Sequence, residues 1–174
     1  MQKNIILTGY MGVGKTTIGA FLAKKRNLPF YDLDQLIEKQ EKKSIKTIFE
    51  TKGEIYFRKI EHALLKEFVE NNSNYVLALG GGTPCYANNH LVLQQPLVSS
   101  FYLKASIAVL SHRLKNNVSE RPLLSNTTAL DELKEQIAKS LFDRSYFYHQ
   151  SKQIISVDDK TIDEIVSEIE QALL

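Results

Sequence analysis

The feature that most constrains this chain is an eight-residue motif near the N-terminus, Gly9-Tyr-Met-Gly-Val-Gly-Lys-Thr16. It matches the pattern G-x-x-x-x-G-K-[ST] at every fixed position, follows the apolar run 5–7, and opens a segment of helical period. Glycines let successive backbone N–H groups turn toward phosphate oxygens. The motif therefore predicts a nucleoside triphosphate site between a strand and a helix, and the alternative, a glycine-rich turn that binds no nucleotide, would need a chance match in this context.

Each polar residue of the motif has an expected task. Lys15 is a point charge for the β- and γ-phosphates and is expected to be catalytic as well as binding, while the Thr16 hydroxyl is expected to bind Mg²⁺. A helix that starts near Lys15 adds the positive end of its dipole. The expected ATP contacts in this region are Gly12, Val13, Gly14, Lys15, Thr16 and Thr17.

Short apolar runs alternate with longer segments of helical period, which is typical of an α/β fold with a parallel sheet. Strands are predicted at 4–8, 29–32, 75–79, 98–103 and 153–157. Helices are predicted at 15–26, 35–40, 45–51, 54–71, 88–94, 107–114 and 130–147, and before a last one Thr161 and Glu164 predict a capping box. The chain has 174 residues and no repeat or linker, so we expect one domain, 1–174.

One segment, 115–128, is polar, contains a proline and has no clear periodicity. Loops of this length inside compact domains are uncommon and often act as lids or binding loops. A surface loop without a task is the alternative.

Asp32 and Asp34 end the second apolar run. Alternation along a strand would put both carboxylates on one side, at the strand end where ligands of parallel sheets sit. One carboxylate could order the water shell of Mg²⁺, and the other could orient an attacking hydroxyl or accept its proton. The alternative is that Asp34 only caps the following helix.

Composition excludes several classes. A net charge of +2 gives no argument for a nucleic-acid or membrane partner, and no stretch approaches the roughly 20 apolar residues of a membrane span. The single cysteine, Cys85, excludes an internal disulfide, suggests a reducing cytoplasmic location, and is expected to be buried. Only five of the 22 basic residues are arginines, which fits their use where a planar, bidentate donor is needed.

Several spaced motifs together resemble shikimate kinase over nearly the whole chain: the motif at 9–16, Asp32-Leu-Asp34, Ile48-Phe-Glu50, Phe57-Arg-Lys-Ile-Glu61, Gly80-Gly-Gly82, Arg121-Pro-Leu-Leu124, and Arg144 with Tyr148. The resemblance implies a three-layer P-loop kinase fold, with a five-stranded parallel sheet flanked by helices, substrate-binding helices at about 33–61 and a mobile lid at about 114–127. It also implies transfer of the ATP γ-phosphate to the 3-hydroxyl of shikimate, in chorismate and aromatic amino-acid biosynthesis. Apart from the resemblance, we expect a monomer located in the cytoplasm.

The resemblance also assigns tasks to residues. It implies that Asp34 hydrogen-bonds the substrate hydroxyls, that Arg58 and Arg144 hold the carboxylate, and that Asp32 acts on Mg²⁺ through water. Arg121 would reach the phosphates from the lid and act in catalysis, and Arg113 would lie near the adenine. The remaining implied substrate contacts are Phe49, Phe57, Gly81 and Gly82.

The residues themselves support this in part. Glu61 follows Arg58 by three positions on a predicted helix, where it could hold the guanidinium in place, although the pair could equally be a surface ion pair worth little. Two rival functions stay open: a gluconate or nucleoside monophosphate kinase on the same scaffold, and a nucleotide-binding module without catalysis. The intact Lys15, Asp34 and Arg121 argue against the second.

Overall fold

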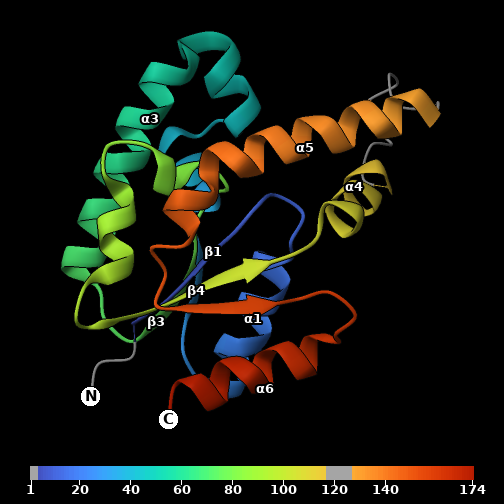
Figure 1. Ribbon diagram of the computed structural model, residues 1–174. Helices are drawn as coiled ribbons and strands as arrows, with labels where there is room; N and C mark the ends of the chain where they lie inside the picture. The colour runs from blue at the N-terminus through green and yellow to red at the C-terminus, as the bar shows by residue number, and fades with distance from the viewer. Residues whose placement is uncertain (1–3, 117–126) are drawn as a thin grey trace.

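A five-stranded sheet forms the centre of the computed structural model, which describes residues 4–116 and 127–174 (Figure 1). The strands run in the order β2-β3-β1-β4-β5, and every neighbouring pair is parallel. Their bounds are β1 Asn4–Thr8, β2 Phe30–Asp32, β3 Tyr75–Ala78, β4 Val98–Lys104 and β5 Gln153–Ser156. The predicted parallel sheet is confirmed, with each strand bound within one residue of its expected position.

Six α-helices and two short 3₁₀-helices connect the described strands: α1 Lys15–Arg26, α2 Leu33–Glu41, α3 Ile45–Asn71, η1 Thr83–Cys85, η2 Asn89–Gln94, α4 Ile107–Asn116, α5 Thr127–Tyr148 and α6 Ile162–Ala172. The helix predicted at 88–94 is present as a six-residue 3₁₀-helix, Asn89–Gln94, which starts from a left-handed Asn88. Inside α3, Gly53 has φ 79° and ψ 172°, so the helix divides into the two predicted segments.

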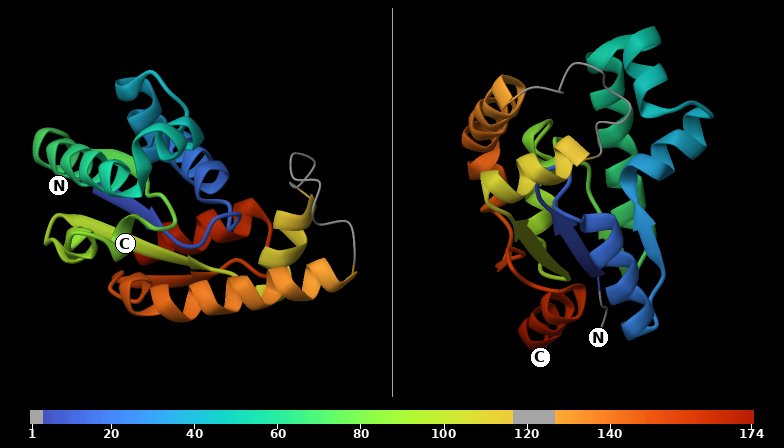
Figure 2. Two further views of the ribbon diagram at one scale, coloured as in Figure 1. Left: turned by 90° about the horizontal axis from the view of Figure 1, so that it is seen from above. Right: turned by 90° about the vertical axis from the view of Figure 1, so that its right-hand side faces the viewer.

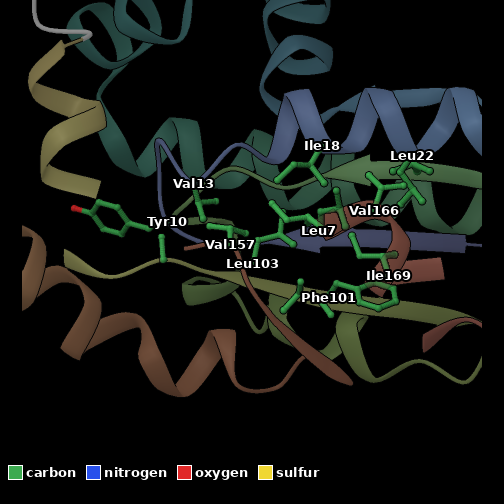
Figure 3. Packing of buried hydrophobic residues seen from close by; sticks show 14 of the residues in the cluster. Leu7, Tyr10, Val13, Ile18, Leu22, Phe101, Leu103, Val157, Val166 and Ile169 are labelled. Atoms are coloured by element: carbon green, nitrogen blue, oxygen red, sulfur yellow. The ribbon is translucent and has the colours of Figure 1, made fainter. Parts of the chain in front are cut away.

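The sheet is covered on both faces, so its inner strands are buried at nearly every position. On β1, Ile5 and Leu7 point to one face and join a core with α1 and α6, whereas Ile6 points to the other face and joins a core with α2 and α3. Figure 2 shows these layers from two further directions, and Figure 3 shows the packing of the first core.

Helix starts follow their capping chemistry. The capping box of Thr161 and Glu164 at the start of α6 is confirmed. At the start of α2, the Asp32 carboxylate accepts hydrogen bonds from the backbone N–H groups of Asp34 and Gln35. Strand β2 therefore ends at Asp32 and Asp34 lies in a helix, so the argument from strand alternation is wrong, and the capping role falls to Asp32 instead of Asp34.

The strand order brings three polar segments together. Because β2, β3 and β1 are neighbours and parallel, their carboxyl ends lie side by side at one edge of the sheet. These ends lead into Asp32–Asp34, the glycines 80–82 and the loop 9–14. Within the described residues, no helix has the length and apolar character needed to cross a membrane.

Candidate active site

The loop between β1 and α1 has the conformation that its glycines allow. Gly14 caps α1 with φ 103°, in the left-handed region that favours glycine. The Lys15 ammonium is buried and donates to the carbonyl oxygens of Gly9 at 2.7 Å and Tyr10 at 3.0 Å. Burial lowers the pKa of Lys15 to about 8, with Asp34 and Asp32 acting in the opposite direction. The loop thus holds its cation in place with protein oxygens.

Thr16 and Asp32 form a pair of oxygen ligands beside this lysine. The Thr16 hydroxyl donates to Oδ2 of Asp32 at 2.7 Å, while Oδ1 of the same carboxylate caps α2. Hydroxyl and carboxylate oxygens are ligands that Mg²⁺ accepts, and this ion usually keeps several waters and bridges to phosphate. The fold therefore brings together Thr16 and Asp32, the two residues expected to bind Mg²⁺.

A cleft of about 630 Å³ opens at this edge of the sheet. Its lining residues are Met11, Gly12, Gly14, Lys15, Thr16, Thr17, Asp32, Asp34, Leu79, Gly80, Gly81 and Arg113. Val13 has its side chain in the core, which leaves only its backbone for a ligand. Arg113, from α4, donates to the carbonyl oxygens of Gly12 and Val13, so it lies against the phosphate loop.

Asp34 lies in the first turn of α2, within the cleft. Burial raises the pKa of its carboxyl to about 6, and Asp32 and Glu61 raise it further, whereas Lys15 acts against them. Near neutral pH the carboxylate is still mostly ionised. It is a stronger proton acceptor than an ordinary aspartate, as a group that orients a hydroxyl requires.

Arg58 is held by a buried acid. Its Nη1 donates to Oε1 of Glu61 at 2.8 Å, and the other Glu61 oxygen accepts from the Thr83 hydroxyl at 2.7 Å. Glu61 is only 1% exposed, so the alternative of a weak surface ion pair is wrong. A buried carboxylate with both oxygens bonded fixes the guanidinium more firmly than an exposed pair would.

The glycine turn after β3 passes close to these charged groups. A Cβ atom on Gly80 would lie 2.9 Å from Oδ1 of Asp34, and one on Gly82 would lie 2.7 Å from Nη2 of Arg58. No side chain fits at either position without moving a charged group. The turn therefore brings bare backbone between the acid and the guanidinium.

Arg144, from α5, completes this group. A Cβ on Gly81 would lie 3.6 Å from its Nη1, and its guanidinium carbon lies 5.5 Å from the centre of the Tyr10 ring. Tyr148 donates its hydroxyl to the carbonyl oxygen of Gly81 and also hydrogen-bonds Arg144. Burial raises the pKa of Tyr148, so it stays a neutral donor.

The two phenylalanines contribute packing. The ring centres of Phe49 and Phe57 lie 4.6 Å apart, with Phe57 buried and Phe49 half-buried. The Arg58 guanidinium carbon lies 5.1 Å from the Phe57 ring, which thus supports it. Cys85, expected to be buried, is half-buried near this group.

Two expectations concern other parts of the chain. Arg121 and residues 117–126 of the expected lid lie outside the described residues.

Thr83 was given no role from the sequence, although its hydroxyl forms the second hydrogen bond of the Glu61 carboxylate. The one available signal was its place directly after the glycine turn, which does not reveal a partner 22 positions away.

The chain is similar to known shikimate kinases in both sequence and structure. The family model described as shikimate kinase matches residues 11–174. A shikimate kinase of Flavobacterium johnsoniae is 53% identical over 168 residues, which cover 97% of each chain. The crystal structure of shikimate kinase from Bacteroides thetaiotaomicron has a TM-score of 0.87 at 34% identity, covering 99% of both chains. A structure of the Acinetobacter baumannii enzyme in complex with shikimate has a TM-score of 0.83 at 30% identity, covering 98% of this chain and 92% of that one.

Proposed function

This chain belongs to the shikimate kinase family and phosphorylates shikimate in aromatic amino-acid biosynthesis, and on that premise we propose which residues carry out the reaction. The γ-phosphate of ATP passes to the 3-hydroxyl of shikimate, which gives shikimate 3-phosphate and ADP. The observation that supports this most is the glycine turn between Asp34 and Arg58, directly beside the phosphate loop. Shikimate carries hydroxyl groups and a carboxylate. Its site therefore needs an acceptor such as the Asp34 carboxylate and a cation such as the Arg58 guanidinium, next to the bound triphosphate.

The nucleotide occupies the loop side of the cleft. We assign its phosphates to the backbone of 12–17 and to Lys15, and we assign Arg113 to the nucleotide side because it already contacts the loop carbonyls. Negative phosphates favour the charged form of Lys15, which offsets the effect of burial on its pKa. Arg121 is assigned to the phosphates on family resemblance, since it lies outside the described residues.

Mg²⁺ fits beside the same loop. Thr16 would bind it directly and Asp32 through water, because their oxygens lie 2.7 Å apart at the wall of the cleft. Among the described residues there is no group of three or more His, Cys, Asp or Glu side chains arranged for a metal, so most of its ligands would be phosphate and water. When bound, the ion neutralises charge on the phosphates.

Shikimate occupies the opposite side. We propose that Arg58 and Arg144 bind its carboxylate, and that the backbone of Gly81 and Gly82 contacts the ring. Phe49 and Phe57 support this side by packing, within an acceptor-binding region formed by about 33–61. All these residues come from one chain, which suits a monomer, and the single cysteine suits the cytoplasm.

Asp34 aligns the reacting hydroxyl. Phosphoryl transfer goes through a loose transition state, so positioning and charge neutralisation matter more than covalent chemistry. The Asp34 carboxylate accepts the hydrogen bond of the 3-hydroxyl and takes up its proton as the new P–O bond forms. Its raised pKa suits this exchange near neutral pH.

The test is an assay of ADP release with ATP, Mg²⁺ and one of four acceptors: shikimate, quinate, gluconate or AMP. Turnover with shikimate far above the other three is the expected result. Turnover only with gluconate or AMP would keep the phosphate loop and overturn the acceptor assignment. ATP binding without turnover on any acceptor would favour a non-catalytic module.

A further inference from the structure

Arg58 has a second set of contacts besides its hydrogen bond to Glu61. Tyr86 follows η1, and the centre of its ring lies 4.0 Å from the Arg58 guanidinium carbon. The Phe57 ring is farther from the same carbon, at 5.1 Å. A cation this close to an aromatic ring is attracted by the ring's quadrupole, and more strongly where water is excluded.

The Tyr86 hydroxyl adds a bridge through a carboxylate. It donates to Oε1 of Glu54 at 3.1 Å, and the same oxygen accepts from Nε of Arg58 at 3.4 Å. Burial and the hydrogen bond to Glu54 raise the pKa of the Tyr86 phenol, so it remains a neutral donor. Tyr86 thus meets Arg58 with its ring and, through Glu54, with its hydroxyl.

Arg58 and Tyr86 both line a groove of about 510 Å³. Glu61 and Thr83 fix one end of the guanidinium from the protein interior. On the groove side, the Tyr86 ring covers part of a guanidinium that would otherwise face solvent. One short segment, 83–86, therefore supports Arg58 in two ways: Thr83 hydrogen-bonds Glu61, which holds Arg58, and the Tyr86 ring contacts Arg58 itself.

We propose that Tyr86 is a positioning residue, which together with Glu54 fixes the plane of the Arg58 guanidinium for the shikimate carboxylate. This inference rests on the proposed function, in which Arg58 binds that carboxylate. A bidentate contact depends on the orientation of the guanidinium plane, and Glu61 alone holds only one of its nitrogens. Fixing the plane in advance lowers the entropy lost on binding.

The experiment compares Tyr86→Leu and Tyr86→Phe with the unchanged protein in steady-state kinetics. Tyr86→Leu is expected to raise KM for shikimate about 3- to 10-fold, while KM for ATP and kcat change less than about twofold. Tyr86→Phe keeps the ring and is expected to recover most of the loss. The control is Phe142→Leu, since Phe142 is 85% exposed on α5, and it should leave all constants unchanged.

A double-variant cycle separates positioning from a general structural effect. In an Arg58→Lys background, Tyr86→Leu is expected to change KM for shikimate less than about twofold, because the planar partner is gone. An unchanged KM in Tyr86→Leu alone, or an equal rise in both backgrounds, would overturn the inference. Absence of shikimate turnover in the unchanged protein would instead refute the proposed function, and the inference with it.

Discussion

At the scale of single residues, Asp34 combines its proposed role in the reaction with a cost in stability. Burial, with Asp32 and Glu61 nearby, raises its pKa from 3.8 to about 6, so the folded protein holds this proton more tightly than the unfolded chain. The folded state therefore binds more protons between these two values, and its stability falls as pH rises through that window. Above pH 6 the ionised Asp34 carboxylate opposes folding.

The variant Asp34→Asn should therefore lose activity and gain stability. We expect kcat to fall at least about 100-fold, because the amide takes up no proton. The free energy of unfolding at pH 7 should rise by on the order of 1 kcal/mol, a figure reduced for the partial exposure of the group. Urea unfolding at pH 7 and pH 4 measures this, since the gain should nearly vanish at pH 4. Near-normal turnover would refute the role, and lower stability at pH 7 would refute the electrostatic argument.

A second residue-scale prediction concerns Gly82→Ala. The added Cβ would lie 2.7 Å from Nη2 of Arg58, which is hydrogen-bonded to Glu61 and lies against the Tyr86 ring. We expect KM for shikimate to rise about tenfold or more, with KM for ATP unchanged, in steady-state assays that vary each substrate in turn. An equal loss for both substrates would mean that the turn has collapsed as a whole.

Sequence reasoning identified Asp34 by a wrong argument. The predicted strand ended at residue 32, but the alternation of a strand was applied as far as Asp34, whereas the Asp32 carboxylate caps α2 and Asp34 lies in the first turn of that helix. A short acidic side chain permits both structures, so local pattern cannot choose between them. The residue was still correctly placed in the cleft, since either structure leaves it at the carboxyl end of β2.

At the scale of elements, the break in α3 depends on Gly53. Its φ of 79° and ψ of 172° lie in a region nearly restricted to glycine, although a Cβ there would meet no atom within 4 Å. Gly53→Ala should lower the free energy of unfolding by about 1–3 kcal/mol through backbone strain alone. Urea unfolding would measure it, with Glu50→Ala as the exposed control in the same helix. A neutral result would mean that α3 straightens at no cost.

Most elements could be predicted because their periodicities are local. The strands of the sheet and helix α1 follow from apolar runs and from the glycine motif between them. The 3₁₀ form of the helix at Asn89–Gln94 could not, because its apolar spacing in six residues fits either kind of helix. The two partners of Glu61 also differ in how far they could be predicted. Arg58 lies three positions away on the same helix, so the sequence indicated this pair. Thr83 meets Glu61 only through the tertiary fold, so the sequence did not reveal it.

At the scale of the whole molecule, nucleotide binding should stabilise the entire fold. A ligand present at 100 times its Kd adds about 2.7 kcal/mol, which for a chain of this size raises Tm by roughly 5–10 °C. We expect Mg²⁺ with ADP to produce this shift in a thermal unfolding scan. Lys15→Met should remove most of it, whereas Lys24→Met, on the exposed face of α1, should keep it. A full shift in Lys15→Met would refute the role of Lys15 in phosphate binding.

The order of the strands has a consequence for how such enzymes acquire new substrates. The chain leaves the sheet at Asp32 and returns at Tyr75, on the neighbouring strand, and the excursion carries Asp34, Phe49, Phe57 and Arg58. The loop at 9–16, which we propose binds the nucleotide, lies outside this excursion. Most of the proposed acceptor site therefore lies in one insertion with two junctions, while Gly81, Gly82 and Arg144 lie outside it. A chimera that exchanges 33–74 between kinases of this architecture would keep its phosphate donor, and it would change the molecule that receives the phosphate only if these three positions suit the new acceptor.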